Sequence, residues 1–362
     1  MEKKENYTLR ALYLIAILFV VDGHIPLGEM MNFGGLFRYY SFHLMLFAFG
    51  SGYFFSRKGG VFHQFMHSVK RLLVPLYGFN LLYGLLAAGL RRFFGAELGA
   101  PLSGYTLLIA PMTDGQHFVY NLGAWFIFPL FLVKTVYLLL DAAFSRAKHK
   151  EELLFLLTLI PGCIAVQLCH TSRQEVLPLF ALRSMILLPG YAAGILYREK
   201  LERLDTLPTV PYLLGIVVLR ALLCVRYENL AYLLSDCSYF ACDAFGVYAG
   251  AALAIAFYLR IARLLAPHIQ KSRLALFVSR HTFDIMMHHY MGFYLVNLFF
   301  LALNILKIGA ADFSVLSLRT QAGYVYAPGG RSEWAAIYLL AGVLLPCALA
   351  FLTDQIKQKK HD

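Results

Sequence analysis

Long apolar segments recur along this chain and constrain its fold more than any other feature. Ten runs carry few charges, and each is long enough for a helix to cross the roughly 30 Å hydrocarbon core of a bilayer. Hydrophobic residues make up 59% of the 362 residues, charged residues only 15%, and the mean hydropathy is +0.62. A soluble protein of this length carries far more charge. The sequence therefore predicts an all-α, polytopic integral membrane protein with about ten transmembrane helices.

The ten predicted spans are separated by polar segments. They cover residues 7–25, 36–56, 72–93, 120–141, 152–169, 179–197, 209–225, 231–259, 275–303 and 333–353. No small-residue cleavage site follows the first span, so we expect a retained helix and not a signal peptide. Six cysteines lie in or near apolar runs without CxxC spacing, which favours neither a metal site nor disulfides. We predict a single membrane-embedded domain over residues 1–362, with no separate soluble domain.

The basic residues are distributed unevenly between the two sides of the predicted membrane. The chain has 32 Lys and Arg residues and a net charge of +11. They lie in short loops at nearly regular intervals, which is typical of the positive-inside rule and not of a nucleic-acid surface. With the N-terminus inside, cytoplasmic segments hold 20 of these residues and the opposite loops hold 8. We therefore predict cytoplasmic termini, a multi-pass protein of the plasma membrane, contact with membrane lipid and no nucleic-acid partner.

The first apolar run carries a cation at one end and an imidazole at the other. Arg10 and His24 are fourteen residues apart, which in a helix places them within roughly 40° of one face and about 21 Å apart in depth. The simplest interpretation is a positive-inside anchor and an interfacial cap. A functional pair is the alternative. His43, near the outer end of the second predicted span, would be a second imidazole on the same side, and a histidine at that depth is costly unless it faces a cavity or a partner.

The segment after the second span is basic. Residues 57–71 read RKGGVFHQFMHSVKR, which we predict to be a cytoplasmic loop. Arg57, Lys58, Lys70 and Arg71 would form a cationic mouth suited to an anionic ligand that bears phosphates. A plain topology signal would explain the same charges.

Further charges fall inside the predicted spans. Arg280 and Asp284, four residues apart on one predicted helix, are expected to pair with each other. A second set, expected to lock helices through ion pairs, comprises Arg183, Arg220, Asp236 and Asp243. Two outer segments, residues 94–119 and 304–332, are long enough to cover a site or contact a glycan, and plain connectors of this length are equally common.

Six motifs resemble, in the same order, those of the membrane-bound acyltransferase-3 family. They are VVDGH (20–24), FHLMLFAFGSGYFF (42–55), KRLLVP (70–75), GAWFIFPLF (123–131), LLPGYAAGILYREK (187–200) and SRHTFDIMMHHYMGF (279–293). The last is similar to the family's closing NTxxIMxxH segment. The resemblance is closest to the sugar and exopolysaccharide O-acetyltransferase branch, which includes fucose 4-O-acetylase-like proteins. It runs from about residue 10 to the last predicted span.

The resemblance implies an activity. Members of the family take an acyl group, usually acetyl, from cytosolic acyl-CoA and pass it to a sugar hydroxyl. A hydroxyl is a weak nucleophile at neutral pH, so the reaction needs a base, and histidine is the natural choice. The expected donor is acetyl-CoA, and the expected acceptor is a carbohydrate, either a cell-surface polysaccharide or a lipid-linked sugar. No metal is expected.

The resemblance also implies roles for particular residues. His24 is the expected general base, and we assign the family's patterned histidine to His288, with His43 as a further catalytic candidate. The residues expected to hold the phosphates of acyl-CoA are Arg10, Lys58, Lys70 and Arg71. Those expected to bind substrate or support the structure are Asp22, Tyr53, Trp125 and His289. The family's basic residue eleven positions before the histidine is Tyr13 here, so Arg10, one turn earlier, is expected to substitute for it.

A glycan or small-anion transporter is the alternative function. Ten helices with buried charges and proline breaks would suit a transporter equally well. Transporters commonly have related halves, however, and residues 1–180 show no repeat in residues 181–362. A sensor would need a soluble output domain, and none is expected.

Overall fold

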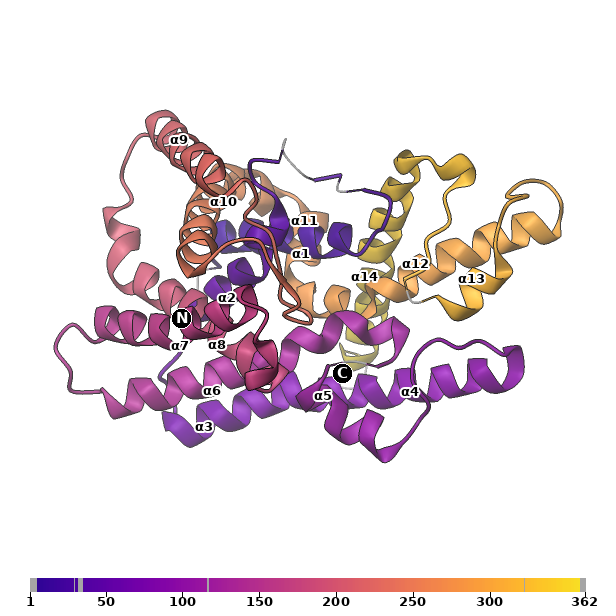
Figure 1. The fold of residues 1–362 in the computed structure, drawn as a ribbon, viewed down its shortest axis with the longest axis horizontal. Coiled ribbons are helices and arrows are strands. Elements are labelled where there is room, and N and C mark those ends of the chain that lie inside the picture. The colour runs from indigo at the N-terminus through magenta and orange to yellow at the C-terminus, as the bar shows by residue number, and fades with distance from the viewer. Residues whose placement is uncertain (1–4, 29, 32–34, 116, 322, 359–362) are drawn as a thin grey trace. The chain divides into compact units, whose positions relative to one another are not determined.

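The computed structural model describes residues 5–28, 30–31, 35–115, 117–321 and 323–358, and these are almost entirely helical (Figure 1). The helices are α1 (Tyr7–Gly23), α2 (His43–Tyr53), α3 (Gly60–Ser68), α4 (Val74–Phe94), α5 (Ala110–Thr113), α6 (Ile127–Ala143), α7 (Lys150–His170), α8 (Leu179–Leu196), α9 (Thr209–Tyr227), α10 (Ala244–Lys271), α11 (Arg273–Arg280), α12 (Thr282–Ile305), α13 (Val315–Thr320) and α14 (Ala335–Gln358). Two strands, β1 (Tyr232–Leu233) and β2 (Tyr239–Phe240), form one short antiparallel hairpin. The predicted all-α class is confirmed.

Eight helical stretches among the described residues are long and apolar enough to cross a membrane. They are Gly60–Phe94, Val119–Ala143, Lys150–His170, Leu179–Leu204, Thr209–Tyr227, Ala244–Lys271, Thr282–Ile305 and Ser332–Ile356. Helix α1 adds 17 residues, or about 25 Å. The polytopic membrane class is therefore confirmed, whereas the number ten stays a prediction.

The second predicted span is wrong as a continuous helix. Residues 36–56 contain a three-residue 3₁₀ turn, Tyr39–Ser41, followed by α2, which has only 11 residues. Such a helix is about 16 Å long, so α2 alone is too short to cross the apolar core of a bilayer. The orientation predicted from the basic residues therefore requires residues 36–56 to cross as a broken segment. Apolar composition predicted the burial of this segment but could not reveal the break before His43.

The basic segment at residues 57–71 is not a loop. Gly60–Ser68 forms α3, and Val69–Leu73 forms a π-helical turn that leads directly into α4. The N-cap of α3, Gly59, has a φ angle of +84°, a conformation that glycine adopts without strain. Lys70 and Arg71 therefore lie on the π-helical turn, and their positions are set by the helix.

The eighth predicted span is displaced along the chain. Residues 231–243 form the β hairpin and its flanks, and α10 begins only at Ala244. Asp243 lies just before α10 and accepts hydrogen bonds from the Gly246 amide at 3.0 Å and from the Tyr227 hydroxyl at 2.8 Å. The Gly246 amide holds the pKa of Asp243 below its usual range. Asp243 is thus a helix-capping carboxylate, because it binds the free amides at the start of α10.

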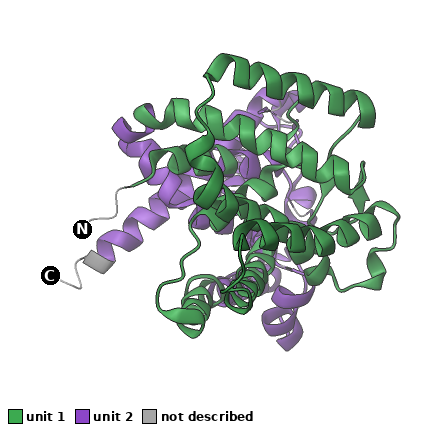
Figure 2. Cartoon of the chain, turned by 90° about the vertical axis from the view of Figure 1, so that its left-hand side faces the viewer, with its two compact units in different colours: residues 1–16, 32–75, 125–267 green, residues 17–31, 76–124, 268–362 purple. Residues whose placement is uncertain are grey.

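The chain folds into two compact units whose sequences are interleaved (Figure 2). Unit 1 contains residues 1–16, 32–75 and 125–267, and unit 2 contains residues 17–31, 76–124 and 268–362. Helix α1 contributes its first part to unit 1 and its last part to unit 2. That the chain acts as one domain stays a prediction.

In unit 1, α2 packs against α8 through glycines. A Cβ atom at Gly52 would overlap the carbonyl oxygen of Tyr191, and one at Gly194 would overlap the carbonyl oxygen of Phe49. The two backbones can approach this closely only because both positions lack a side chain. The motif GSGY in α2 therefore serves close helix packing.

In unit 2, α12 packs against α14 in the same way. A Cβ atom at Gly342 would come within 2.7 Å of Phe293 and within 2.8 Å of Val21. One at Gly292 would reach 2.5 Å from the carbonyl oxygen of Ala341. Close packing through small residues thus fixes α12, which carries the histidines discussed below.

We expect the membrane orientation to follow the basic residues. Reporter fusions after residues 148 and 200 should be cytoplasmic, and fusions near residues 100 and 318 should be external, because 20 basic residues favour one side and 8 the other. A paired phosphatase and fluorescent-protein assay measures this. Opposite results at any two of the four positions would overturn the orientation. Lys3, Lys4, Lys359 and Lys360, which contribute to the count, lie outside the described residues.

Candidate active site

His24 lies directly after the last residue of α1 and contacts a second histidine from α12. Its Nδ1 atom is 3.1 Å from Nε2 of His289, and the two rings stack with centroids 4.9 Å apart. His289 is fully buried, whereas His24 is only partly buried. The structure therefore holds Nδ1 of His24 against a buried histidine, while part of the His24 side chain stays exposed.

The hydrogen bonds of His289 determine which nitrogen of His24 carries the proton. Nδ1 of His289 lies 3.0 Å from the carbonyl oxygens of both Ile285 and Met286. Carbonyls only accept, so this nitrogen must carry the hydrogen, and Nε2 of a neutral His289 must be an acceptor. If His24 donates to it from Nδ1, Nε2 of His24 is the acceptor nitrogen of the neutral ring, and the Val20 carbonyl also accepts a hydrogen bond from this imidazole. An imidazole in this tautomer is ready to accept a proton at Nε2.

Two further residues hold this pair in place. The carboxylate of Asp22 accepts the Met31 amide at 3.1 Å and so ties down the segment that follows His24. Asp22 is fully buried, and its own backbone oxygen accepts the Ile25 amide at 3.0 Å. At Gly123 a Cβ atom would come within 2.6 Å of the His289 ring, so only glycine leaves room for this imidazole.

His288 points to other groups. Its Nδ1 atom is 2.6 Å from the hydroxyl of Tyr83, and the ring of Phe79 meets it edge-on at 4.5 Å. Adjacent helix residues differ by about 100°, so only one of two neighbouring histidines can face His24. If His281 and Thr282 occupy the first two positions of NTxxIMxxH, its histidine falls on His289, whereas a catalytic role for His288 stays a prediction.

A recess of aromatic and amide side chains in unit 2 includes Tyr290, whose ring centroid is 5.2 Å from that of His24. Its lining residues are Leu98, Val119, Tyr120, Tyr290, Phe293, Tyr294, Asn297, Leu318, Gln321, Gly323 and Tyr324. Segments 94–119 and 304–332, which the sequence singled out, both contribute to it. Aromatic walls with a few polar groups are typical of small-molecule sites.

Three other predicted site residues lie in unit 1. The ring nitrogen Nδ1 of His43 bonds the carbonyl oxygen of Tyr39 at 2.6 Å. The ring of Trp125 lies beneath the guanidinium of Arg183, 4.8 Å from its centroid. The hydroxyl of Tyr53 donates to Glu202 at 2.8 Å and accepts from Asn6 at 2.9 Å. These contacts give Trp125 and Tyr53 structural partners.

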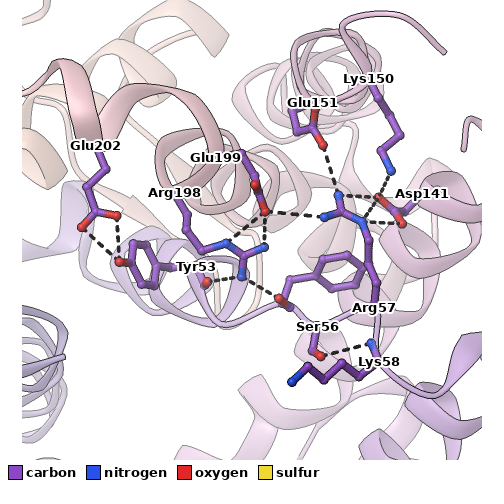
Figure 3. A network of polar contacts seen from close by, with 11 residues as sticks. Tyr53, Ser56, Arg57, Lys58, Asp141, Lys150, Glu151, Arg198, Glu199 and Glu202 are labelled. Atoms are coloured by element: carbon purple, nitrogen blue, oxygen red, sulfur yellow. Dashed lines mark hydrogen bonds and ion pairs between the residues drawn. The ribbon is translucent and has the colours of Figure 1, made fainter. Parts of the chain in front are cut away.

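Arg57 belongs to a network of ion pairs in unit 1 (Figure 3). Its guanidinium contacts Asp141 at 2.9 Å, Glu151 at 3.2 Å and Glu199 at 3.5 Å. Lys150 reaches the same Asp141 at 2.9 Å. Because three carboxylates surround it, Arg57 is committed to this network and is not available to a phosphate.

A second arginine extends the network to the end of α2. Arg198 contacts Glu199 at 2.6 Å and donates to the carbonyl oxygens of Tyr53 and Phe55 at 2.7 and 2.6 Å (Figure 3). A cation at these carbonyls satisfies the C-terminal end of a short helix. This contact fixes α2 against the end of α8.

We expect removal of the Asp141 charge to destabilise unit 1. Asp141→Asn leaves Arg57 and Lys150 without their shared counterion, and Asp141 is only 7% exposed. The free energy of unfolding should fall by about 1–3 kcal/mol, measured as a lower thermal midpoint in detergent. Glu152→Gln is the matched control, because it loses only exposed or half-exposed contacts, to Lys200 at 3.4 Å and to His149 at 3.8 Å. Equal midpoints for the two variants would contradict the structural role.

The predicted phosphate ligands differ in their partners. Arg10 contacts Glu5 at 2.8 Å. Lys58, Lys70 and Arg71 are exposed and form no ion pair with any described residue. In Figure 3 the ammonium end of Lys58 points away from the network around Arg57. Of the predicted phosphate ligands, these three side chains therefore carry charges with no ion-pair partner among the described residues, whereas the charge of Arg10 is partly neutralised by Glu5.

The remaining intramembrane charges have partners that the sequence did not indicate. The guanidinium of Arg220 donates to the carbonyl oxygens of Leu36 at 2.9 Å and Gly250 at 2.6 Å and to the hydroxyl of Ser41, so its partners among the described residues are neutral oxygens. Arg183 bonds the carbonyl oxygen of Ser235. Asp284 contacts His281 at 2.9 Å, and its pairing with Arg280 stays a prediction. Within the described ranges, no group of three metal-ligating side chains could hold a metal ion.

The fold defines the class: a multi-pass α-helical membrane protein, in which a histidine at the end of the first helix contacts a second histidine from α12. The acyltransferase-3 family, described as an acyltransferase domain, matches residues 6–352. The chain belongs to this family and is a membrane-bound acyltransferase. Neither a curated protein nor a solved structure matches the chain.

Proposed function

We propose that this protein transfers an acetyl group from cytosolic acetyl-CoA to a hydroxyl of a cell-surface or lipid-linked glycan at the plasma membrane, with His24 as the general base. The observation that carries the proposal is the hydrogen bond between His24 and His289, because it leaves Nε2 of His24 unprotonated. Membership of an acyltransferase family supports acyl transfer over the transporter alternative.

In the proposed reaction, His24 carries one proton from the sugar hydroxyl to the CoA thiolate. Nε2 takes the proton of the sugar hydroxyl as its oxygen attacks the thioester carbonyl. The carbon–sulfur bond then breaks, and the CoA thiolate leaves and accepts the proton from the imidazolium. The Nδ1–H group of His24 stays bonded to His289 throughout, which stabilises the transient positive charge.

The substrates would use different residues. Lys58, Lys70 and Arg71 would hold the CoA phosphates, because they are exposed and have no carboxylate partner among the described residues. Arg10 would contribute only if a phosphate displaces Glu5. The recess beside Tyr290 would hold the sugar once its walls move apart, because its aromatic and amide groups suit a ring with hydroxyls but its free volume is only about 20 Å³.

Membranes that contain the protein test the proposal directly. They are incubated with radiolabelled acetyl-CoA and with free, nucleotide-linked and lipid-linked sugars, and alkali-labile acetyl esters are measured. We expect one acceptor class to gain label above membranes without the protein. No labelled ester with any acceptor would overturn acetyl transfer to carbohydrate, and label from longer acyl-CoA alone would correct the donor.

A further inference from the structure

Lys134 is a basic residue inside an apolar helix. It lies in α6, within a predicted membrane crossing of mean hydropathy 1.8, and its side chain is mostly buried. A charge in such a helix is costly unless it has a partner, and such residues commonly mark a ligand site. Lys134 falls inside the predicted span 120–141.

The groups around Lys134 are basic. Helix α6 packs side by side with α3 and with the π-helical turn Val69–Leu73 (Figure 1). One turn before Lys134, the ring of Phe131 packs against the ring of Phe65 in α3, with their centroids 5.7 Å apart. Lys134 is close enough to interact electrostatically with Arg71 and His67. Two fixed cations and an imidazole thus meet on these three elements.

No carboxylate neutralises this cluster among the residues that the structure describes. The acidic side chains of α6 to α8 already have partners: Asp141, Glu151 and Glu199 bind Arg57, and Glu152 binds Lys200. Lys134 and Arg71 have no hydrogen bond or ion pair to any described residue. A cationic cluster without its own counterion is stabilised by an anion from outside the chain.

We propose that Lys134 and Arg71 together bind a phosphate of the acyl donor. The guanidinium would hold two phosphate oxygens in a fork, and the ammonium would add a point charge from the apolar side. Arg71 lies on a π-helical turn, a geometry that recurs at functional sites. This inference rests on the proposed function, whose donor is an acyl-CoA, and adds Lys134 to the donor site.

Binding to purified protein in detergent tests the proposal. The ligands are coenzyme A, pantetheine (which lacks the phosphates) and inorganic pyrophosphate, measured by calorimetry. Lys134→Gln should weaken coenzyme A about tenfold to a hundredfold and leave pantetheine unchanged. Lys134→Arg should retain most of the affinity. Arg146→Gln, which removes an exposed cation from the loop after α6, is the matched control and should change little.

The stability of the free protein gives a second readout. Since Lys134 has no counterion among the described residues, Lys134→Gln should keep or raise the thermal midpoint without ligand. A purely structural lysine would lower it. Unchanged coenzyme A affinity, or equal losses for pantetheine, would overturn the proposal. If pyrophosphate binds and Lys134→Gln weakens it, but coenzyme A does not bind, the result would support an anion site at Lys134. The same result would contradict the proposal that acyl-CoA is the donor.

Discussion

His24→Gln should lower acyl transfer by at least about 10²-fold, the usual range for removing a general base. Glutamine keeps a hydrogen-bonding amide that can donate to His289, so the local structure should persist, but it cannot take a proton from a hydroxyl. His24→Ala should be similarly poor. The measurement is acetylation of the acceptor by membranes with each variant, normalised to protein level by immunoblot.

Measuring acetyl-CoA binding distinguishes a variant that has lost its general base from one that has lost its fold. Both His24 variants should bind acetyl-CoA as the unmutated protein does, because the proposed phosphate ligands are other side chains and keep their charges. Near-normal transfer by His24→Gln would remove the base role from His24. In that case His43, whose Nδ1 is bonded to the Tyr39 carbonyl, becomes the next candidate because its other nitrogen is an acceptor.

His289→Ala should lower kcat about tenfold to a hundredfold. This fold-change corresponds to the free energy lost with one hydrogen bond to a charge that develops in the transition state. His289 is a positioning residue, because it acts on the substrate only through His24. Its loss should leave the KM for acetyl-CoA nearly unchanged. His289→Gln should restore part of kcat, since an amide oxygen can still accept from Nδ1 of His24. Initial rates at varied donor concentration measure both constants.

His288 provides the comparison within the same helix turn. Its imidazole bonds the hydroxyl of Tyr83 and does not touch His24, so His288→Gln should cost less kcat than His289→Ala. A larger loss at His288 than at His289 would contradict the assignment of the positioning role to His289. Equal effects on KM and kcat at His289, without rescue by glutamine, would indicate general structural damage.

The sequence by itself determined the class and most of the helices. Apolar runs longer than a bilayer crossing can only be satisfied as helices, since a backbone in lipid must bond to itself. The sequence also predicted that His24 lies at the end of the first apolar helix, and α1 is a regular helix up to Gly23. Family membership followed from motifs in order and was then supported by the match over residues 6–352.

Tertiary structure alone decided which polar groups meet. His288 and His289 are the same residue type at adjacent positions, so the sequence cannot tell them apart. Only the packing of α12 determines that His289 faces His24. Arg57 and Lys134 are both basic residues near the same predicted membrane face, yet one is surrounded by carboxylates and the other has none among the described residues. Hydropathy counts charges along the chain, whereas pairing depends on distances between helices, so the free cations and the proton position on His24 required the folded protein.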